Sequence, residues 1–351
     1  MLALVKHAAG SGNMELREIP EPEPGPGEVK IAVQIASICG SDLHIRKGDI
    51  GIPMRYPVVP GHEFSGIIRK AGPGVDQSLI GARVTGENTR SACGKCRYCA
   101  SGSYNLCRER LATGYAFNGA FTDYVIIPIA RIHRLPDKVD FASGALTDPS
   151  ACAYHAVQEL TRVSAGDLAL VTGPGPMGLF CLQYVKANGA KAILTGRQND
   201  KNRLELGKQL GADYVCASDQ PEEEIMKISN GCGVDVALEC SGAQAAVNLC
   251  LKTLRREGSF TQVGICGKPV TLDFDQVLYK ELRVAGSFSQ KFWGWEKALE
   301  FCAGGHIKVK PLITHSFALK DWQKAFDLFE RSEAIKVVFA IGAQNGTTNQ
   351  A

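Results

Sequence analysis

Residues 168–178 read LALVTGPGPMG, and this stretch decides the fold class. A short apolar run, Leu168–Thr172, precedes three glycines at the spacing G-x-G-x-x-G, and an apolar segment then continues to Ala187. A strand, such a turn and a helix form the phosphate-binding start of a βαβ unit, because the glycines let a pyrophosphate approach the helix N-terminus. The residues predicted to contact the dinucleotide are Gly173, Gly175, Pro176, Met177 and Gly178.

Strands and helices alternate downstream of this turn. We expect helices at Met177–Ala187 and Asn202–Leu210, and strands at Lys191–Thr195, Val234–Cys240 and Ser259–Ile265. Strands that alternate with helices indicate a parallel sheet covered by helices. This part of the chain is therefore predicted to be α/β, with a doubly wound parallel sheet.

Residues 1–150 have a different pattern, in which short apolar runs lie between turns rich in glycine and proline. The strands expected here are Glu28–Ser37, Val58–Gly61, Phe64–Arg69 and Ala120–Ile127. Near the other end of the chain, Asp321 is expected to cap a helix, and Lys336–Ile341 to form a last strand. The first part of the chain thus reads as an irregular β-rich unit.

The composition narrows the class of protein. A chain of 351 residues allows about two domains. The net charge of +3 gives no reason to expect nucleic acid or a membrane surface as partner, and no apolar run approaches the ~18 residues of a membrane span. The first residues lack the apolar core of a secretion signal, so the 13 cysteines are expected in a reducing, cytoplasmic compartment.

Four cysteines lie close together at the spacing C-x2-C-x2-C-x7-C, namely Cys93, Cys96, Cys99 and Cys107. Four thiolates in one short segment can surround a tetrahedral ion, and such a closed set is the usual structural zinc site. A ferredoxin-type iron–sulfur run instead has three residues before its last cysteine and a proline after it, whereas Arg108 stands here. Unliganded buried cysteines remain the alternative.

A second constellation offers different ligand atoms. Cys39, His62 and Glu63 supply sulfur, nitrogen and oxygen, a set that leaves a position open and is typical of catalytic zinc. Each residue alone is compatible with a purely structural role. Their joint occurrence ahead of the four-cysteine segment favours a catalytic metal.

In combination, these motifs resemble one enzyme family. The order GSDLH at 40–44, PGHE at 60–63, the four-cysteine segment and the glycine turn resembles the zinc-dependent medium-chain alcohol and polyol dehydrogenases, and most of all their sorbitol (L-iditol) dehydrogenase branch. The resemblance implies a GroES-like β-barrel catalytic domain at 1–151 and 289–351, with a structural zinc lobe at 91–110, and a Rossmann cofactor domain at 152–288. It also implies two zinc ions per chain and a homodimer or homotetramer.

Residue by residue, the resemblance implies roles at the catalytic zinc. Cys39 and His62 match the family's ligands, and Glu63 matches the carboxylate ligand of the polyol branch. Ser41 matches the hydroxyl that receives the alcohol proton, and His44 matches the relay residue nearer solvent. Asp148 stands where the branch has a glutamate that ligates or flanks the zinc, and the shorter side chain is expected to flank it.

The choice of nicotinamide cofactor depends on the residues at the end of the expected strand Lys191–Thr195. NAD enzymes carry an acid about 20 residues beyond the glycine turn, where it binds the ribose hydroxyls. Here the strand ends in Gly196-Arg197, and Arg197 offers positive charge for a 2′-phosphate. By the family resemblance, Arg203 matches an arginine near the same ribose. Asp200 is the alternative, an acid that a longer loop would bring to the ribose. NADP is therefore favoured over NAD.

The expected reaction is hydride transfer between a small polyol or secondary alcohol and the nicotinamide. Related zinc dehydrogenases for 2,3-butanediol, threonine or a sugar phosphate are the alternatives within enzymes, because no motif fixes the substrate pocket. A non-catalytic dinucleotide-binding redox sensor is the alternative outside enzymes. The chain retains Cys39, His62, Glu63, Ser41 and His44, which such a sensor has no reason to keep.

Overall fold

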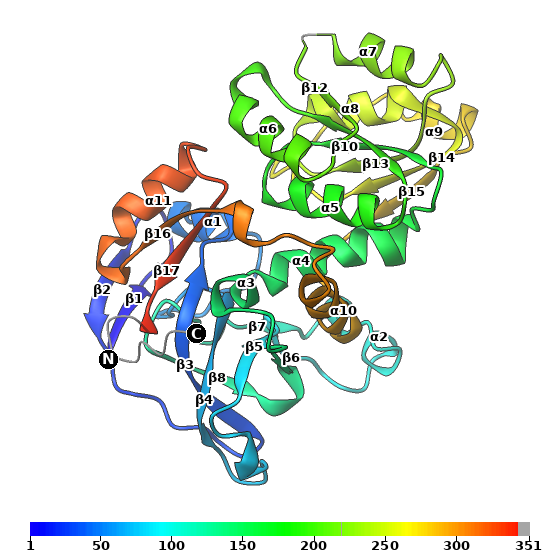
Figure 1. The fold of residues 1–351 in the computed structure, drawn as a ribbon. Coiled ribbons are helices and arrows are strands. Elements are labelled where there is room, and N and C mark those ends of the chain that lie inside the picture. Colours follow the sequence, from blue (N-terminus) through cyan, green and yellow to red (C-terminus); the bar gives the residue numbers. More distant parts are fainter. Residues whose placement is uncertain (219, 343–351) are drawn as a thin grey trace. The chain divides into compact units, whose positions relative to one another are not determined.

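The computed structural model describes residues 1–218 and 220–342, and the chain divides into two compact units (Figure 1). The first unit contains Met1–Asp148, Lys291–Ala303 and the described chain from Val309 onward. The second contains Pro149–Gln290 and Gly304–Lys308. The boundaries differ from the expected 151/152 and 288/289 by a few residues, and the stretch Gly304–Lys308 groups with the second unit instead of the first.

The second unit is built on a six-stranded parallel sheet in the order β12-β11-β10-β13-β14-β15. The strands are β10 (Leu168–Thr172), β11 (Lys191–Thr195), β12 (Tyr214–Cys216), β13 (Val234–Glu239), β14 (Leu254–Gln262) and β15 (Arg283–Gly286). The helices are α5 (Pro176–Ala187), α6 (Lys201–Gln209), α7 (Pro221–Ile228), α8 (Gln244–Thr253) and α9 (Asp275–Tyr279), with a 3-10 turn at Gln198–Asp200. Helices cover both faces of the sheet (Figure 1), and its central strands β10, β11 and β13 are mainly apolar and largely buried.

The strand order places a crevice at one point of this sheet. The chain moves outward from β10 in one direction through β11 and β12, and in the other through β13, β14 and β15. Ligands of such sheets bind beyond the carboxyl ends of the strands where the direction reverses, here between β10 and β13. This is the Rossmann topology that the glycine turn predicted.

The first unit is built around a seven-stranded, largely antiparallel sheet. Its path is β16-β17-β3-β4-β5-β9, and β8 pairs with β3 beside it. These strands are β3 (Glu28–Ser37), β4 (Glu63–Ala71), β5 (Arg83–Gly86), β8 (Tyr124–Pro128), β9 (Ile132–Arg134), β16 (Ile313–Phe317) and β17 (Lys336–Ala340). Two small sheets add β1 (Leu2–Lys6) with β2 (Met14–Glu18), and β6 (Thr89–Ser91) with β7 (Leu111–Ala112).

Short helices close the first unit. They are α1 (Gly40–Lys47), α2 (Arg97–Ala100), α3 (Phe141–Ala145), α10 (Phe292–Ala303) and α11 (Trp322–Glu330), with 3-10 turns at Gln77–Leu79, Tyr104–Leu106, Ile129–Arg131, Lys310–Leu312 and Leu319–Asp321. The helix α4 (Thr147–Tyr154), continued by a π-helical turn at His155–Thr161, carries the chain across the boundary between the units. No helix within 1–218 and 220–342 is both long and apolar enough to span a bilayer.

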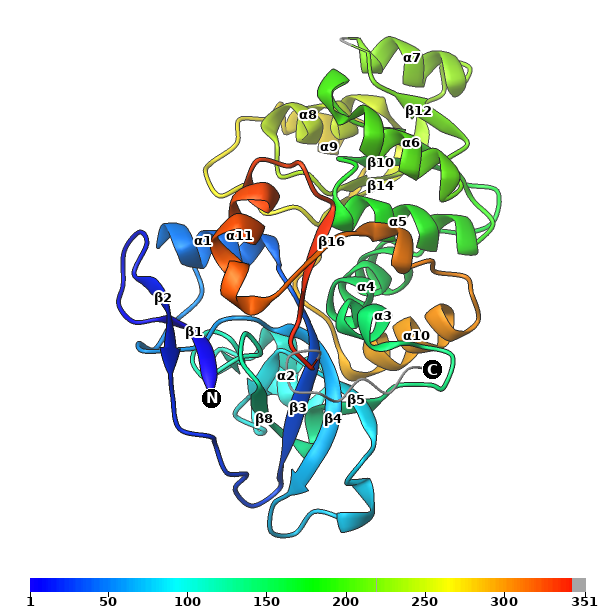
Figure 2. The ribbon, with the colours of Figure 1, turned by 60° about the vertical axis from the view of Figure 1, so that its left-hand side comes forward.

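The last part of the chain completes the core of the first unit. Strand β17 pairs antiparallel with β3 through Val338 and Ser37, and α11 lies beside α1 (Figure 2). Ion pairs join the two helices, from Arg46 to Asp327 at 2.6 Å and from Lys47 to Glu330 at 2.9 Å. The C-terminal segment is therefore part of the same body as the N-terminal strands.

Two local expectations for the first unit are wrong. Val58–Gly61 is not a strand, and only Val58 forms a bridge, to Lys6. Pro57 and Pro60 flank this short apolar run, and because a proline has no N–H to donate, the run cannot form a full ladder. The helix that follows Asp321 exists as α11, but the Asp321 side chain makes no capping hydrogen bond.

Candidate functional site

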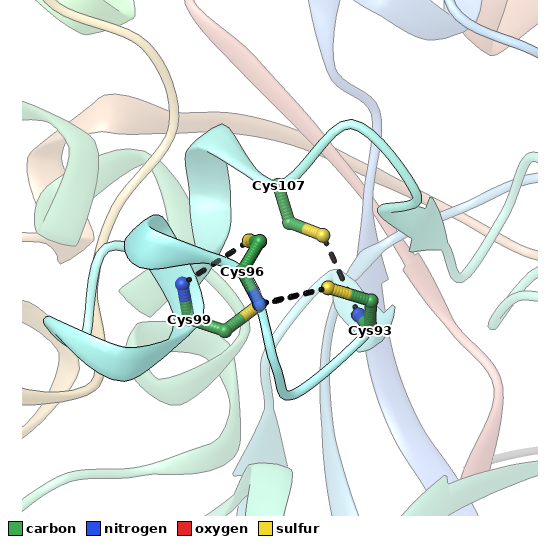
Figure 3. Close-up of side chains that lie close together, drawn as sticks. All are labelled: Cys93, Cys96, Cys99 and Cys107. Carbon is green, nitrogen blue, oxygen red and sulfur yellow. Dashed lines mark hydrogen bonds between the residues drawn. The ribbon is translucent and has the colours of Figure 1, made fainter.

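The four-cysteine segment forms a compact lobe (Figure 3). The Sγ atoms of Cys93, Cys96, Cys99 and Cys107 all lie within 4.8 Å of one another, and those of Cys93 and Cys99 are 3.9 Å apart. A disulfide would need about 2.05 Å, whereas sulfurs about 2.3 Å from one tetrahedral zinc lie roughly 3.8 Å apart. Within the described residues, none of the 13 cysteines forms a disulfide. The spacing of the sulfurs thus fits a closed zinc site.

The backbone of the lobe is also arranged for thiolates. The N–H groups of Cys93, Cys96 and Cys99 donate to the sulfurs of Cys107, Cys93 and Cys96 at 3.4, 3.4 and 3.5 Å (Figure 3). Donation from the backbone of Lys95 and Cys96 lowers the pKa of Cys93 to about 7. Burial together with the neighbouring thiols raises the pKa of Cys99 to about 12. Four neighbouring thiols do not all ionise without a counter-charge. A bound divalent cation supplies that charge and stabilises the four thiolates.

The second ligand set comes from two places in the first unit. Cys39 is the N-cap of α1, while His62 and Glu63 lie at the start of β4. One ligand atom from each of the three lies within 4.8 Å of the other two. His62 and Glu63 are almost fully buried. The predicted catalytic constellation is therefore brought together, with a donor set of one sulfur, one nitrogen and one oxygen.

The charges around His62 show that this cluster suits a cation. Burial opposes protonation of the ring, yet the negative charges of Cys39, Asp42 and Asp148 raise the pKa of His62 to about 10. His62 Nδ1 and Asp42 Oδ1 are both buried without a hydrogen-bond partner. A metal-binding histidine commonly donates its second ring N–H to a carboxylate, and Asp42 provides one close by. The residues thus fit zinc.

Asp42 also holds Cys39 in place. Its Oδ2 accepts the backbone N–H of Cys39 at 2.9 Å, as part of a capping box at the start of α1. Burial raises the pKa of Asp42, partly offset by the charge of His62. The acid of the GSDLH motif therefore positions Cys39 and adds negative charge near His62.

A buried lysine occupies the far side of Glu63. Lys336 Nζ donates to Glu63 Oε1 at 2.7 Å and to Oε2 at 2.5 Å, and both side chains are at most 2% exposed. The same ammonium donates to the carbonyl of Ile38 at 3.0 Å. Burial opposes the charge, but Glu63 and Cys39 raise the pKa of Lys336, so it remains a cation. Glu63 thus has a resident counter-ion from β17.

The predicted proton-transfer residues lie in the same unit. Ser41, in the first turn of α1, accepts a hydrogen bond at 2.9 Å from the hydroxyl of Tyr115. His44, also on α1, contacts Asp49 Oδ1 through Nδ1 at 2.9 Å and is 41% exposed. Asp148 is buried at the start of α4 and lies outside the three-residue cluster, to which it contributes negative charge. Within the described chain, no hydrogen bond joins Ser41 to His44.

The glycine turn has the geometry that a pyrophosphate requires. Gly173 has a φ of +85°, which a residue with a side chain rarely adopts, and Gly175 faces open space at the N-cap of α5. A Cβ at Gly178 would lie 1.9 Å from the carbonyl oxygen of Gly173. Pro176 occupies the first helical position, where its missing N–H costs nothing, and Met177 follows it. Gly173 and Gly178 thus each have a steric reason within the chain, whereas Gly175 leaves open space at the helix N-terminus.

A cavity of about 1460 Å³ adjoins this turn within the second unit. Its walls include Gly173, Gly175, Gly196, Arg197, Asp200 and Arg203. The Asp200 carboxylate accepts the backbone N–H of Arg197 at 2.9 Å and its Nε at 3.3 Å. Asp200 is therefore already engaged by Arg197.

Gly196 is restricted by the turn itself. A Cβ at this position would lie 2.8 Å from Cγ of Pro174 and 3.1 Å from a methyl group of Leu204. Ordinary carbon–carbon contacts are about 3.5–4.0 Å. An acidic side chain therefore has no room at 196 while Pro174 is in the turn.

Comparisons with known proteins identify the family of the chain. Residues 25–137 match the model of the alcohol dehydrogenase GroES-like domain, and residues 176–304 match that of the zinc-binding dehydrogenases. A sorbitol dehydrogenase from Halalkalibacterium halodurans is 42% identical over 96% of this chain and 98% of its own. The chain belongs to the zinc-dependent medium-chain alcohol and polyol dehydrogenases.

Of two further relatives of this dehydrogenase, one is named for its substrate and the other was solved with its cofactor. A D-arabitol-phosphate dehydrogenase from Enterococcus avium is 38% identical over 96% of this chain and 97% of its own. A zinc-binding dehydrogenase from Sinorhizobium meliloti, solved with NADP, has a TM-score of 0.89 at 30% identity, over 97% of this chain and 99% of that one. The expected combination of a GroES-like and a Rossmann domain is confirmed, as is alcohol or polyol oxidoreductase activity for the family.

Sequence reasoning missed three residues of the dehydrogenase site. Asp42 lies inside the quoted GSDLH motif, and its place three residues after Cys39 is the signal of a capping box. Tyr115 and Lys336 gave no local signal. A lysine at the start of a strand reads as a solvent-facing residue, and only the fold shows that Lys336 is buried against Glu63.

Proposed function

We propose that this dehydrogenase interconverts a polyol or secondary alcohol and its ketose or ketone, and that it uses NADP in preference to NAD. The observation that carries the reaction is the buried cluster of Cys39, His62 and Glu63 with the Ser41 hydroxyl on the adjoining helix. When bound, zinc supplies Lewis acidity toward the alcohol oxygen, and the nicotinamide accepts the hydride. In the alcohol, the O–H proton and the C–H hydride both leave, so the carbinol carbon is oxidised by two electrons.

Each residue of the catalytic site has a separate proposed role. Cys39, His62 and Glu63 hold the metal, and the four cysteines of the lobe hold a second zinc with no open position. The Ser41 hydroxyl accepts the proton of the substrate hydroxyl and passes its own proton onward toward solvent, where His44 is exposed. Asp148 contributes negative charge beside His62. Zinc is thus expected at two sites per chain.

The preference for NADP rests on two features of the cavity. Gly196 excludes an acid from the position where NAD enzymes need one, because Pro174 fills the space. Arg197, whose side chain is 79% exposed, presents its guanidinium at the cavity, and Arg203 lines the same wall. Asp200 orients Arg197 through two hydrogen bonds and is thereby less available to ribose hydroxyls. A 2′-phosphate would pair with these arginines.

A second copy of the chain is the proposed partner, as a homodimer or homotetramer. Strand β15 ends the parallel sheet, and large apolar side chains near this edge are exposed, including Val284 at 49%, Leu278 at 71% and Tyr279 at 67%. Exposed apolar edges of this kind invite pairing. We also propose a cytoplasmic location, in keeping with 13 cysteines that form no disulfide within the described residues.

Parallel assays with NADP⁺ and NAD⁺ on the zinc-loaded protein test the proposal, with sorbitol, other polyols, simple secondary alcohols and phosphorylated polyols as substrates. We expect turnover of an unphosphorylated polyol and a higher kcat/KM for NADP⁺. A preference for NAD⁺ would contradict the role given to Arg197. Turnover of phosphorylated polyols alone would move the substrate class to that of the arabitol-phosphate enzyme.

A further inference from the structure

Tyr115 is a polar side chain in the catalytic unit to which neither the sequence nor the family resemblance assigned a role. Its hydroxyl donates to Ser41 Oγ at 2.9 Å, and the residue is only 3% exposed. Its ring lies against the ring of His62, with centroids 5.4 Å apart and planes 39° apart. Tyr115 therefore contacts both the proposed proton acceptor and one proposed metal ligand.

The backbone fixes Tyr115 relative to this site. A Cβ at the preceding residue, Gly114, would lie 3.0 Å from the carbonyl oxygen of Gly61, which directly precedes His62. The Tyr115 carbonyl accepts the N–H of Arg55 at 3.0 Å. The ring also joins Ile45 of α1 in a small apolar cluster. Packing on several sides leaves the phenol little freedom to move.

The hydrogen-bonding capacity of serine determines what Tyr115 can do. A serine hydroxyl has one hydrogen to donate and two lone pairs to accept with. When the Tyr115 hydroxyl occupies one lone pair, Ser41 retains one lone pair for the substrate proton and one hydrogen to pass on. In this hydrogen bond the phenol is the donor and the Ser41 oxygen is the acceptor. The contact thus leaves Ser41 the two roles that a relay needs.

We propose that Tyr115 is a positioning residue that orients the Ser41 hydroxyl to accept the proton of the substrate alcohol. The inference rests on the proposed function, and it adds a residue that acts through Ser41. The phenol keeps its own proton throughout. The proton of the alcohol moves to Ser41 as the Ser41 proton leaves toward solvent.

The substitution Tyr115→Phe removes only the hydroxyl and keeps the packing against His62. We expect kcat for alcohol oxidation to fall about tenfold with little change in the KM for the nicotinamide, as for loss of one hydrogen bond made in the transition state. The solvent deuterium isotope effect on kcat should rise, because proton removal becomes slower. Tyr115→Met, which fills the same apolar cluster without a hydroxyl, should give the same kinetic change.

Tyr184→Phe is the matched control. The buried hydroxyl of Tyr184 lies 2.9 Å from that of Ser150, and both residues belong to the cofactor-binding unit. This substitution should leave the isotope effect unchanged. In a Ser41→Ala background, Tyr115→Phe should have almost no further effect on kcat. A full tenfold loss in that background, or a kcat of Tyr115→Phe within twofold of wild type, would overturn the inference.

A wild-type protein that oxidises no alcohol would instead contradict the proposed function. The contact itself is then judged from melting temperatures of wild type, Tyr115→Phe, Ser41→Ala and the double variant. If the decrease in Tm of the double variant differs from the sum of the two single decreases, Tyr115 and Ser41 are coupled. If it equals that sum, the inference is overturned.

Discussion

Lys336 offers the sharpest test of how the catalytic unit is held together. Its ammonium is 2% exposed, contacts both oxygens of Glu63 and reaches the carbonyl of Ile38. The substitution Lys336→Met keeps the length of the side chain but leaves the Glu63 carboxylate buried, near Asp42 and Cys39. Loss of one partner from a buried ion pair costs about 3–5 kcal/mol, because the remaining charge has no compensation.

The expected effect is measurable in the metal-free protein. For a unit of this size, 1 kcal/mol corresponds to about 2–4 °C in Tm, so Lys336→Met should lower the Tm of the first unit by about 6–20 °C. Calorimetry or circular dichroism in the presence of a chelator measures this loss. The double variant Lys336→Met/Glu63→Gln should recover part of it, since glutamine carries no charge.

The control is another lysine with little exposure of its own but exposed partners. Lys30 is 8% exposed and pairs with Glu21 and Glu23, which are 49% and 59% exposed. Lys30→Met should change Tm only slightly, because water solvates the carboxylates left behind. The reasoning is refuted if Lys336→Met melts like Lys30→Met, or if the double variant is no more stable than the single one.

Three further predictions follow from features of the two units. Gly178→Ala should abolish cofactor binding, measured by quenching of protein fluorescence, because its methyl group would lie 1.9 Å from the Gly173 carbonyl oxygen; retained affinity would contradict this geometry. Cys107→Ser should remove one of two zinc ions in elemental analysis while the protein still binds nicotinamide. Burial opposes protonation of His133, but Glu296 and Glu87 raise its pKa. The contribution of the His133–Glu296 ion pair to the free energy of unfolding is therefore complete below about pH 6.5, and it is lost as the pH rises through the raised pKa. Glu296→Gln should flatten the Tm profile above that pH, and an unchanged profile would exclude the pair as its cause.

The parts of the site that the sequence predicted are those set by local spacing. The glycine turn and the four-cysteine lobe each occupy one short segment, so the residue types and their intervals contain the geometry. Strands such as Glu28–Ser37 and Leu168–Thr172 were predicted at their true bounds because their apolar pattern and flanking turns agree. Val58–Gly61 has an apolar pattern too, but the prolines beside it prevent a ladder.

The parts that escaped prediction depend on distant contacts. Lys336 meets a partner 273 positions earlier, and Tyr115 meets Ser41 across 74 positions. No periodicity within β17 or within the Tyr115 turn distinguishes these side chains from ordinary strand and turn residues. The same holds for the lack of space for a side chain at position 196, because the contact with Pro174 exists only once the glycine turn and the next strand are placed together.

The position of β17 has a consequence for how the enzyme is made. Translation proceeds from the N-terminus, so all residues of the cofactor-binding unit, which ends at Lys308, are synthesised before the strand that carries Lys336. Until then, Glu63 lacks its counter-ion, and residues 35–37 of β3 lack the partners that β17 provides. A chain that stops short of residue 336 would therefore be able to bind a dinucleotide without possessing a finished catalytic centre.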